Sequence, residues 1–258
     1  MHIETLGSGP SLVLLHGWAL HGGVFAPLVQ RLSDRYTLHL VDLPGHGFSC
    51  DSEVPLTLDA TVTAILARTP PAAWLAWSLG GLFALHAAAS SSQVRGLAMI
   101  AATPRFVRDG DWPHAVEGRV FAQFGDDLRN DYAGTLERFL ALDTMGSEHA
   151  RSELRTLKHD LYARGEPAPE ALQQGLHLLE QSDLRATLPA LSVPTLWLAG
   201  RRDLLVPAKA MQASAAVTPQ ATFVEIAGGG HAPFLGHADR VAADVDRFMQ
   251  ALPLGATA

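Results

Sequence analysis

Short apolar runs that end in turn-forming residues are the feature of this sequence that most restricts its fold. One such run is Leu12–Leu15, which is followed at once by His16 and Gly17. Comparable runs occupy residues 36–41, 73–76, 97–101, 195–199 and 222–226. Runs this short, with little polar alternation, are typical of strands buried on both faces of a parallel sheet. The sequence therefore predicts a mostly parallel sheet at the centre of the molecule.

Helical patterns lie between these runs. They cover residues 56–68, 79–89, 207–217 and 238–252. Thr57 is suited to cap the first of these helices, and Pro207 is suited to open the third. Strands that alternate with helices form an open sheet flanked by helices. The predicted fold class is therefore α/β.

Residues 104–188 interrupt this alternation, because no apolar run in them predicts a strand. The stretches 134–142, 147–162 and 169–179 have helical patterns instead. An insertion at the carboxyl edge of an α/β sheet lies where ligands bind in such folds. We therefore expect residues 1–103 and 189–258 to form one core that carries residues 104–188 as a helical lid. Residues 254–258 are expected to be a frayed tail.

Composition excludes several classes of protein. Hydrophobic residues form 48% of the 258 residues and charged residues 17%, which excludes a disordered chain. The formal net charge is −7, whereas general nucleic-acid binding needs a basic surface. The one cysteine, Cys50, excludes an internal disulfide framework and a cysteine-based zinc site. No apolar run approaches the length of a membrane span, and Met1–Thr5 carries no basic targeting segment. We expect a soluble cytoplasmic protein that binds neither membrane nor nucleic acid.

Ser78 is the candidate nucleophile. It lies in the sequence Ala76-Trp77-Ser78-Leu79-Gly80, between a predicted strand and a predicted helix. This is the setting of the G-x-S-x-G nucleophile elbow, in which a tight turn exposes the serine hydroxyl. Ala76 replaces the first glycine, and alanine is the smallest alternative. The pattern is short, so an ordinary serine in a turn is the competing interpretation.

Two further residues stand in the order that a serine hydrolase of the α/β type requires. Asp203 follows the run at 195–199, and His231 follows the run at 222–226. The carboxyl ends of parallel strands meet at one edge of a sheet, which would bring both near Ser78. A turn aspartate and a surface histidine are the alternatives. We expect Ser78 to attack, His231 to move the proton and Asp203 to orient the imidazole.

The stretch His16-Gly17-Trp18 predicts part of an oxyanion hole. In this arrangement one backbone N–H comes from the loop after the first buried strand, and the other from the residue after the nucleophile. These are the N–H groups of Trp18 and Leu79. The alternative for His16-Gly17 is a simple strand-ending turn, and we expect the His16 side chain to be structural.

No cofactor or metal is expected. The three glycines 228–230 lack the pattern of a phosphate-binding loop, and we interpret them as a flexible approach to His231. No H-E-x-x-H sequence occurs, and no group of histidines and carboxylates has the spacing of metal ligands.

Four segments resemble the α/β-hydrolases, and most of all the pimeloyl-[acyl-carrier protein] methyl ester esterases of biotin synthesis. They are residues 12–18, 37–47, 77–81 and 231–234. A fifth segment, Glu137–Gly146 in the predicted lid, is much rarer among hydrolases and carries the assignment to this family. The resemblance implies a carboxylesterase. It releases methanol from the methyl ester of a pimeloyl group attached to acyl-carrier protein, which is its partner.

The resemblance also implies a set of binding residues. The substrate pocket takes in Trp18, Ser78, Leu79, Phe139, Leu140, Ala141, Leu142, Asp143 and His231. The family commonly has glutamine where this chain has Asp143, and a carboxylate cannot donate a hydrogen bond as an amide can.

The resemblance further implies that Arg138, Arg151 and Arg155 dock the acidic carrier protein. At a further position where the family has an arginine, this chain has Gly134. Arg151, Arg155 and Lys158 share one helical face, so pairing with the nearby carboxylates of residues 148, 153 and 160 is the alternative. Residues 104–188 hold 10 basic and 15 acidic residues, so docking would depend on how the arginines are displayed.

Two other functions stay open. One is a different serine hydrolase on the same scaffold, such as a short-chain esterase, a lactonase or a C–C bond hydrolase. The other is a non-catalytic ligand receptor. Whichever function holds, we expect the protein to be a monomer.

Overall fold

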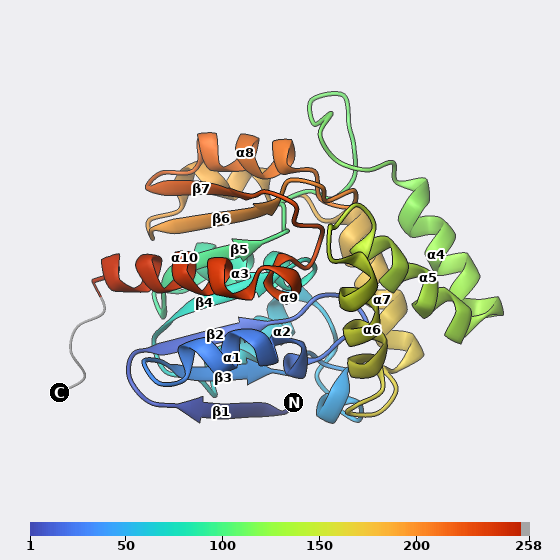
Figure 1. The fold of residues 1–258 in the computed structure, drawn as a ribbon, viewed down its shortest axis with the longest axis horizontal. Coiled ribbons are helices and arrows are strands. Elements are labelled where there is room, and N and C mark those ends of the chain that lie inside the picture. Colours follow the sequence, from blue (N-terminus) through green and yellow to red (C-terminus); the bar gives the residue numbers. More distant parts are fainter. Residues whose placement is uncertain (254–258) are drawn as a thin grey trace.

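The core is a seven-stranded sheet with the strand order β1-β3-β2-β4-β5-β6-β7. The computed structural model describes residues 1–253 (Figure 1). The strands are β1 (Ile3–Gly7), β2 (Ser11–Leu15), β3 (Thr37–Val41), β4 (Ala72–Trp77), β5 (Val94–Ile100), β6 (Thr195–Gly200) and β7 (Ala221–Ile226). Neighbouring strands are parallel, except that β1 runs antiparallel to β3. The predicted α/β class and mostly parallel sheet are confirmed.

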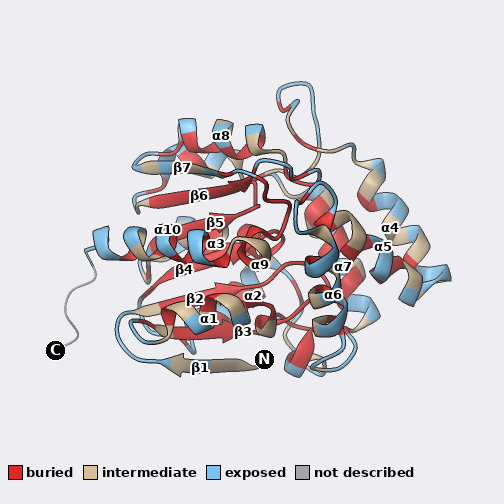
Figure 2. Ribbon diagram, in the orientation of Figure 1, coloured by how far each residue is buried: buried red, intermediate tan, exposed pale blue. Residues whose placement is uncertain are grey.

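The central strands are buried because helices cover both faces of the sheet. Every residue of β4 and β6 is buried, and the red centre of Figure 2 marks this layer. The edge strand β1 is different, because none of its residues is buried. Its mixed sequence at an exposed edge explains why no apolar run predicts it.

The helices of the core form the outer layers. They are α1 (Ala26–Leu32), α2 (Leu58–Leu66), α3 (Gly80–Ser90), α8 (Ala208–Val217), α9 (Pro233–Gly236) and α10 (Ala238–Ala251), with short turns η1 (Gly22–Phe25) and η2 (Gly47–Ser49). Helices α1 and α10 pack together in front of the sheet in Figure 1, while α2 packs on α3. Thr57 caps α2 as expected, by accepting the N–H of Ala60. Pro207 precedes the first residue of α8 and is therefore its N-cap.

Four helices and one short turn occupy the chain between β5 and β6. They are α4 (Arg119–Asn130), α5 (Tyr132–Thr144), α6 (Ala150–Leu161), α7 (Pro169–Gln181) and η3 (Arg185–Ala190). Helix α4 packs on α5 and α7, and α5 packs on α6. Figure 1 shows them at the right, beyond the carboxyl ends of the strands. The sequence pattern did not predict α4, which is largely exposed and has only two buried residues.

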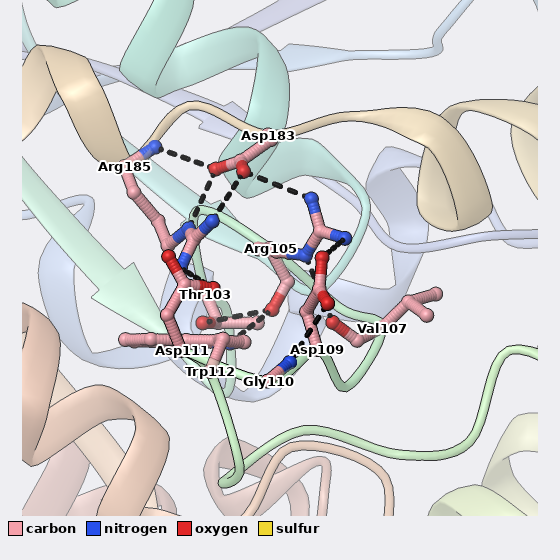
Figure 3. Close-up of polar contacts among 9 residues, drawn as sticks. All are labelled: Thr103, Arg105, Val107, Asp109, Gly110, Asp111, Trp112, Asp183 and Arg185. Atoms are coloured by element: carbon pink, nitrogen blue, oxygen red, sulfur yellow. Dashed lines mark hydrogen bonds and ion pairs between the residues drawn. The ribbon is translucent and has the colours of Figure 1, made fainter.

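The two ends of this helical segment are fastened to each other by ion pairs (Figure 3). The Arg105 guanidinium lies 2.8 Å from carboxylate oxygens of both Asp109 and Asp183. Arg185 pairs with Asp183 at 2.7 Å and lies over the ring of Trp112. Hydrogen bonds from Arg185, together with those from Arg105, lower the pKa of Asp183 to about 2. The place where the chain leaves the core is therefore joined to the place where it returns.

None of the helices within residues 1–253 is both long and apolar enough to cross a membrane. The expected fraying at 254–258 falls outside the described residues.

Candidate active site

Ser78 occupies a strained turn between β4 and α3. Its backbone φ is 53°, in the left-handed region that non-glycine residues seldom adopt. Gly80 makes this turn possible, because a Cβ there would lie 2.6 Å from the carbonyl oxygen of Leu15. A Cβ at Gly81 would likewise lie 2.5 Å from the Cβ of Ala102. The chain thus has glycine where neighbouring atoms approach closely, and backbone strain at the expected nucleophile Ser78.

Ser78, His231 and Asp203 form a hydrogen-bonded chain. The Nε2 atom of His231 lies 2.8 Å from Oγ of Ser78, and its Nδ1 lies 2.8 Å from Oδ2 of Asp203. All three residues are buried, with Ser78 only 2% exposed. The loops after β4, β6 and β7 therefore bring together the three residues that the sequence placed at one sheet edge.

Asp203 is held by the start of the following segment. Its other oxygen, Oδ1, accepts the backbone N–H groups of Leu205 and Val206 at 2.8 and 2.9 Å. These bonds fix the carboxylate while Oδ2 faces His231. An aspartate with two backbone donors on one oxygen is suited to orienting an imidazole.

The glycine loop before His231 is packed tightly, which corrects the expectation of a flexible approach. Gly228, Gly229 and Gly230 are all buried. A Cβ at Gly200 would lie 2.0 Å from the carbonyl oxygen of Gly230, so β6 and this loop touch through their backbones. Glycine is needed here for close approach, which also fixes the position of His231.

The charge of His231 reflects opposing effects. Burial disfavours the imidazolium and lowers its pKa, but the carboxylates of Asp203 and Asp143 favour it. The carboxylates prevail, so the pKa of His231 is raised above its usual value. An imidazole with a stabilised charged form is suited to accept a proton during attack.

The predicted oxyanion donors lie beside the nucleophile. A Cβ at Gly17 would be 3.2 Å from Cβ of Ser78, so the His16-Gly17-Trp18 segment borders the serine. Within the part of the chain that the structure describes, the backbone N–H groups of Trp18 and Leu79 donate no hydrogen bond to protein. Both are therefore available to an oxygen of a bound substrate.

His16 holds this segment in place. Leu43 donates its backbone N–H to Nε2 of His16 at 2.9 Å, so Nδ1 carries the proton and donates to the carbonyl of Gly17 at 2.7 Å. Burial lowers the pKa of His16 well below its usual value. A neutral, fully bonded imidazole agrees with the expected structural role.

Helices α5 and α7 cover the site. The ring of Trp18 lies 4.5 Å from that of Phe139 on α5, and its Nε1 donates to the carbonyl of Leu172 on α7 at 2.8 Å. A Cβ at Gly175 would lie 2.7 Å from the Trp18 ring and 3.2 Å from Leu79. Ser78 is almost fully covered in this arrangement.

Asp143 extends from α5 to His231. Its Oδ1 lies 4.0 Å from Nε2 of His231, and the side chain is fully buried. Neither carboxylate oxygen has a hydrogen-bond partner among residues 1–253. Burial raises the pKa of Asp143 to about 7, although His231 opposes the shift. Near neutral pH this group therefore exists partly as a neutral acid, which can donate a hydrogen bond as an amide does.

The other expected pocket residues on α5 differ in how far they are buried. Phe139 and Leu140 share the buried face of the helix with Asp143. Ala141 and Leu142 are only half-buried, and Ala141 lies on the opposite side of the helix from Phe139. Contact of Ala141 or Leu142 with substrate stays a prediction.

The three arginines that are expected to dock the carrier protein differ in the ion pairs that they form. Arg138 pairs with Asp131 at 3.0 Å and with Asp127 at 3.4 Å. Arg151 and Arg155 are exposed, and neither forms an ion pair with a described residue. The alternative of intrahelical pairing along α6 is therefore wrong for these two arginines.

Lys158 does form an ion pair, but with Glu137 on the neighbouring helix α5, at 2.7 Å. The pairing along α6 that the sequence suggested is therefore absent for Lys158 as well.

The spacing of residues along the sequence did not predict one cluster of potential metal ligands. Glu148, His149 and His237 place one potential metal-ligating atom each within 4.8 Å of the others. Almost ninety positions separate His237 from the other two. Only the packing of the lid against the core brings them together.

Comparisons with known proteins agree with this geometry. A family model described as the alpha/beta hydrolase fold matches residues 10–238. The chain is 69% identical to the pimeloyl-[acyl-carrier protein] methyl ester esterase of Xanthomonas axonopodis pv. citri, over 98% of this chain and 100% of that protein. It is 66% identical to the enzyme of the same name from Stenotrophomonas maltophilia, over 98% and 97% of the two chains.

Solved structures share the fold at lower identity. An esterase from Exiguobacterium antarcticum superimposes with a TM-score of 0.84 at 21% identity, over 97% of this chain and 95% of that one. An enol-lactonase from Burkholderia xenovorans has a TM-score of 0.83 at 19% identity, over 96% of both chains. The structures of an esterase and of a lactonase thus superimpose equally well, so these similarities show only that the fold is shared. The full-length identity to the curated esterases goes further: the chain belongs to the pimeloyl-[acyl-carrier protein] methyl ester esterase family of α/β hydrolases.

Proposed function

We propose that this protein is a serine carboxylesterase that hydrolyses the methyl ester of pimeloyl-[acyl-carrier protein] to the free carboxylate and methanol. One observation carries the proposal. The Ser78–His231–Asp203 hydrogen-bonded chain stands in a protein that matches esterases of that name along nearly its whole length. The sequence resemblance also implies a place in biotin synthesis. Rescue of a biotin auxotroph that lacks its own methyl ester esterase tests this role, with Ser78→Ala as the inactive control.

The first half of the reaction forms an acyl-enzyme. Oγ of Ser78 attacks the ester carbonyl carbon while Nε2 of His231 accepts its proton. The new imidazolium is stabilised by Asp203 across the 2.8 Å contact at Nδ1. The carbonyl oxygen becomes negative and accepts the N–H groups of Trp18 and Leu79. Collapse of this intermediate breaks the ester C–O bond, and His231 delivers its proton to the departing methoxide to give methanol.

The second half regenerates the enzyme. A water molecule attacks the acyl-serine ester, and Nε2 of His231 takes a proton from that water. The second intermediate collapses with transfer of this proton to Oγ of Ser78. Free carboxylate then leaves. The same two N–H groups stabilise the oxyanion in both halves, so loss of their alignment slows both.

The acyl chain is proposed to lie under the lid. Trp18 and Phe139 offer an aromatic surface next to Ser78, and Asp143 offers a polar group beside Nε2 of His231. Covering this space with α5 and α7 excludes water other than the attacking molecule.

Carrier docking is proposed for Arg151 and Arg155 in the first place, because their guanidinium groups are exposed and form no ion pair with residues 1–253. Arg138 would have to exchange its bonds to Asp131 for bonds to the carrier. The double change Arg151→Glu and Arg155→Glu should reduce kcat/KM for the carrier-bound ester at least tenfold. It should leave hydrolysis of a small aryl ester within twofold.

The matched control is Arg95→Glu, an exposed arginine at the opposite end of the strands. This variant should leave kcat/KM unchanged for both substrates. If the double variant loses kcat/KM equally on both substrates, the lid is misfolded, and the loss does not reflect weaker docking of the carrier. Added salt should weaken the carrier reaction alone.

Two assays separate this function from the alternatives. A fluorophosphonate should label the wild-type protein at Ser78 and fail to label Ser78→Ala. No turnover of any ester would favour a non-catalytic receptor. Higher kcat/KM for simple aryl esters or lactones than for the carrier-bound methyl ester would favour a broad hydrolase.

The cytoplasmic location and the monomeric state are proposals from the sequence. Fractionation of cells and size-exclusion chromatography with light scattering test them. A particle mass near the 27.5 kDa of one chain is the expected result.

A further inference from the structure

Three side chains of metal-binding type meet where the lid touches the core. Glu148 and His149 lie in the turn between α5 and α6, and His237 lies between α9 and α10. Oε1 of Glu148 is 3.7 Å from Nε2 of His149 and 3.7 Å from Nε2 of His237. The two imidazole rings are 5.0 Å apart between centroids.

The backbone that carries these side chains is fixed by hydrogen bonds. Glu148 donates its N–H to the carbonyl of Gly228 at 3.0 Å, and His149 donates to the hydroxyl of Ser147 at 3.1 Å. His237 donates to a carbonyl at the start of α9 at 2.9 Å. The backbone positions of the three residues are therefore fixed without an ion, as a binding site requires.

His237 supplies a second observation. Its Nε2 is shielded from solvent and has no hydrogen-bond partner in the part of the chain that the structure describes. The 3.7 Å to Glu148 exceeds the 2.7–3.2 Å of an ordinary N–H···O bond. Buried polar atoms are rarely left unpaired, and each such atom calls for a partner. A metal ion between the imidazole and the carboxylate would provide one.

The ligand set selects the kind of ion. Two imidazoles and one carboxylate suit Zn²⁺ and related first-row divalent ions rather than Ca²⁺ or Mg²⁺. Bonds of roughly 2.0–2.1 Å at tetrahedral angles place ligand atoms about 3.3 Å apart. Two of the pairs lie 3.7 Å apart and all three atoms lie within 4.8 Å, so side-chain rotations would have to shorten these distances. A surface hollow lined in part by Glu148, His149, Arg151 and Arg155 opens two of the three ligands to solvent, which leaves room for a water as fourth ligand.

We propose that Glu148, His149 and His237 bind one Zn²⁺ ion, which joins the lid to the core. Two ligands belong to the lid and the third follows the loop that carries His231, so separation of the lid from the core there would have to break a metal–ligand bond. Bound Zn²⁺ is expected to stabilise the protein and to slow substrate entry. The site does not depend on which ester the enzyme hydrolyses.

Titration calorimetry with ZnCl₂ on the metal-free, full-length protein tests the proposal. One equivalent of Zn²⁺ should bind, and Tm should rise on its addition and fall again with a chelator. His149→Gln and His237→Gln should each weaken binding at least tenfold. The control His177→Gln, an exposed histidine on α7, should change affinity less than twofold.

His149 is exposed, so its replacement leaves the fold intact, and far-ultraviolet circular dichroism verifies this for each variant. Unchanged Zn²⁺ affinity in folded His149→Gln overturns the proposal. So does the absence of a one-to-one complex in the wild-type protein. A rise in Tm that is equal in wild type and His149→Gln shows that Zn²⁺ acts elsewhere, and it also overturns the site.

Discussion

Replacing Asp143 with asparagine should make the stability of this enzyme less dependent on pH. The wild-type carboxyl is fully buried without a hydrogen-bond partner among residues 1–253, and its pKa is raised to about 7 from the usual 3.8. Asparagine has nearly the same shape and does not titrate. The comparison therefore isolates the free energy of keeping this one group neutral.

The direction follows from proton counting. In the unfolded chain Asp143 loses its proton near pH 4, whereas in the folded protein it keeps the proton until about pH 7. Between these values the folded state holds more protons than the unfolded state, so the free energy of unfolding falls as pH rises. About three pH units at 1.36 kcal/mol each give a ceiling of about 4 kcal/mol. Attraction to His231 opposes the upward shift, and the pKa of about 7 already includes this effect.

Urea denaturation from pH 4 to pH 8.5 measures the effect. The free energy of unfolding of Asp143→Asn minus that of wild type should grow by about 2–4 kcal/mol across this range. Asp51→Asn, at an exposed position, should show a difference that stays within about 0.5 kcal/mol. A difference that is constant for Asp143→Asn would refute the reasoning. A difference that shrinks with rising pH would mean that Asp143 is a carboxylate throughout, stabilised by protonated His231.

Three further substitutions test other parts of the structure. Asp203→Asn should lower kcat by about 10⁴-fold in a methanol-release assay, with an unchanged Tm, because the imidazole loses its orienting carboxylate; a loss below tenfold would contradict this role. Arg164→Ala removes the cation 3.2 Å from fully buried Asp42 and leaves it the backbone N–H groups of Gly22 and Phe48, and it should cost about 3–5 kcal/mol in urea denaturation; a cost under 1 kcal/mol would show that these N–H groups and water suffice. Gly200→Ala should lower kcat at least tenfold, since its Cβ would meet the carbonyl of Gly230 at 2.0 Å and displace the catalytic loop. Full activity in that variant would mean that the loop is as flexible as its glycines first suggest.

Local patterns predicted the parts of the fold that depend on neighbouring residues. A buried strand needs a short apolar run, and a nucleophile turn needs small residues around a serine, so β2, β4 and Ser78 were all visible in the sequence. The order of Ser78, Asp203 and His231 was informative because parallel strands end at one edge of the sheet. Strand β1 was missed, since an exposed edge strand needs no apolar run.

Contacts between distant segments could not be predicted in this way. The three glycines before His231 suggested flexibility, but they permit close contact with β6, which the local sequence does not reveal. Asp143 seemed unable to replace an amide as a donor until its burial and unpaired oxygens were known. The cluster of Glu148 and His237 depends on lid packing and has no signature in residue spacing.

Release of methanol from pimeloyl-[acyl-carrier protein] methyl ester is the most direct test of the central claim. The purified wild-type protein should produce one methanol and one free carboxylate per ester hydrolysed. Ser78→Ala should be slower by at least about 10⁴-fold while keeping the wild-type Tm. Turnover by Ser78→Ala at a rate near that of wild type, or no turnover of this ester by wild-type protein that a fluorophosphonate labels at Ser78, would contradict the proposed function.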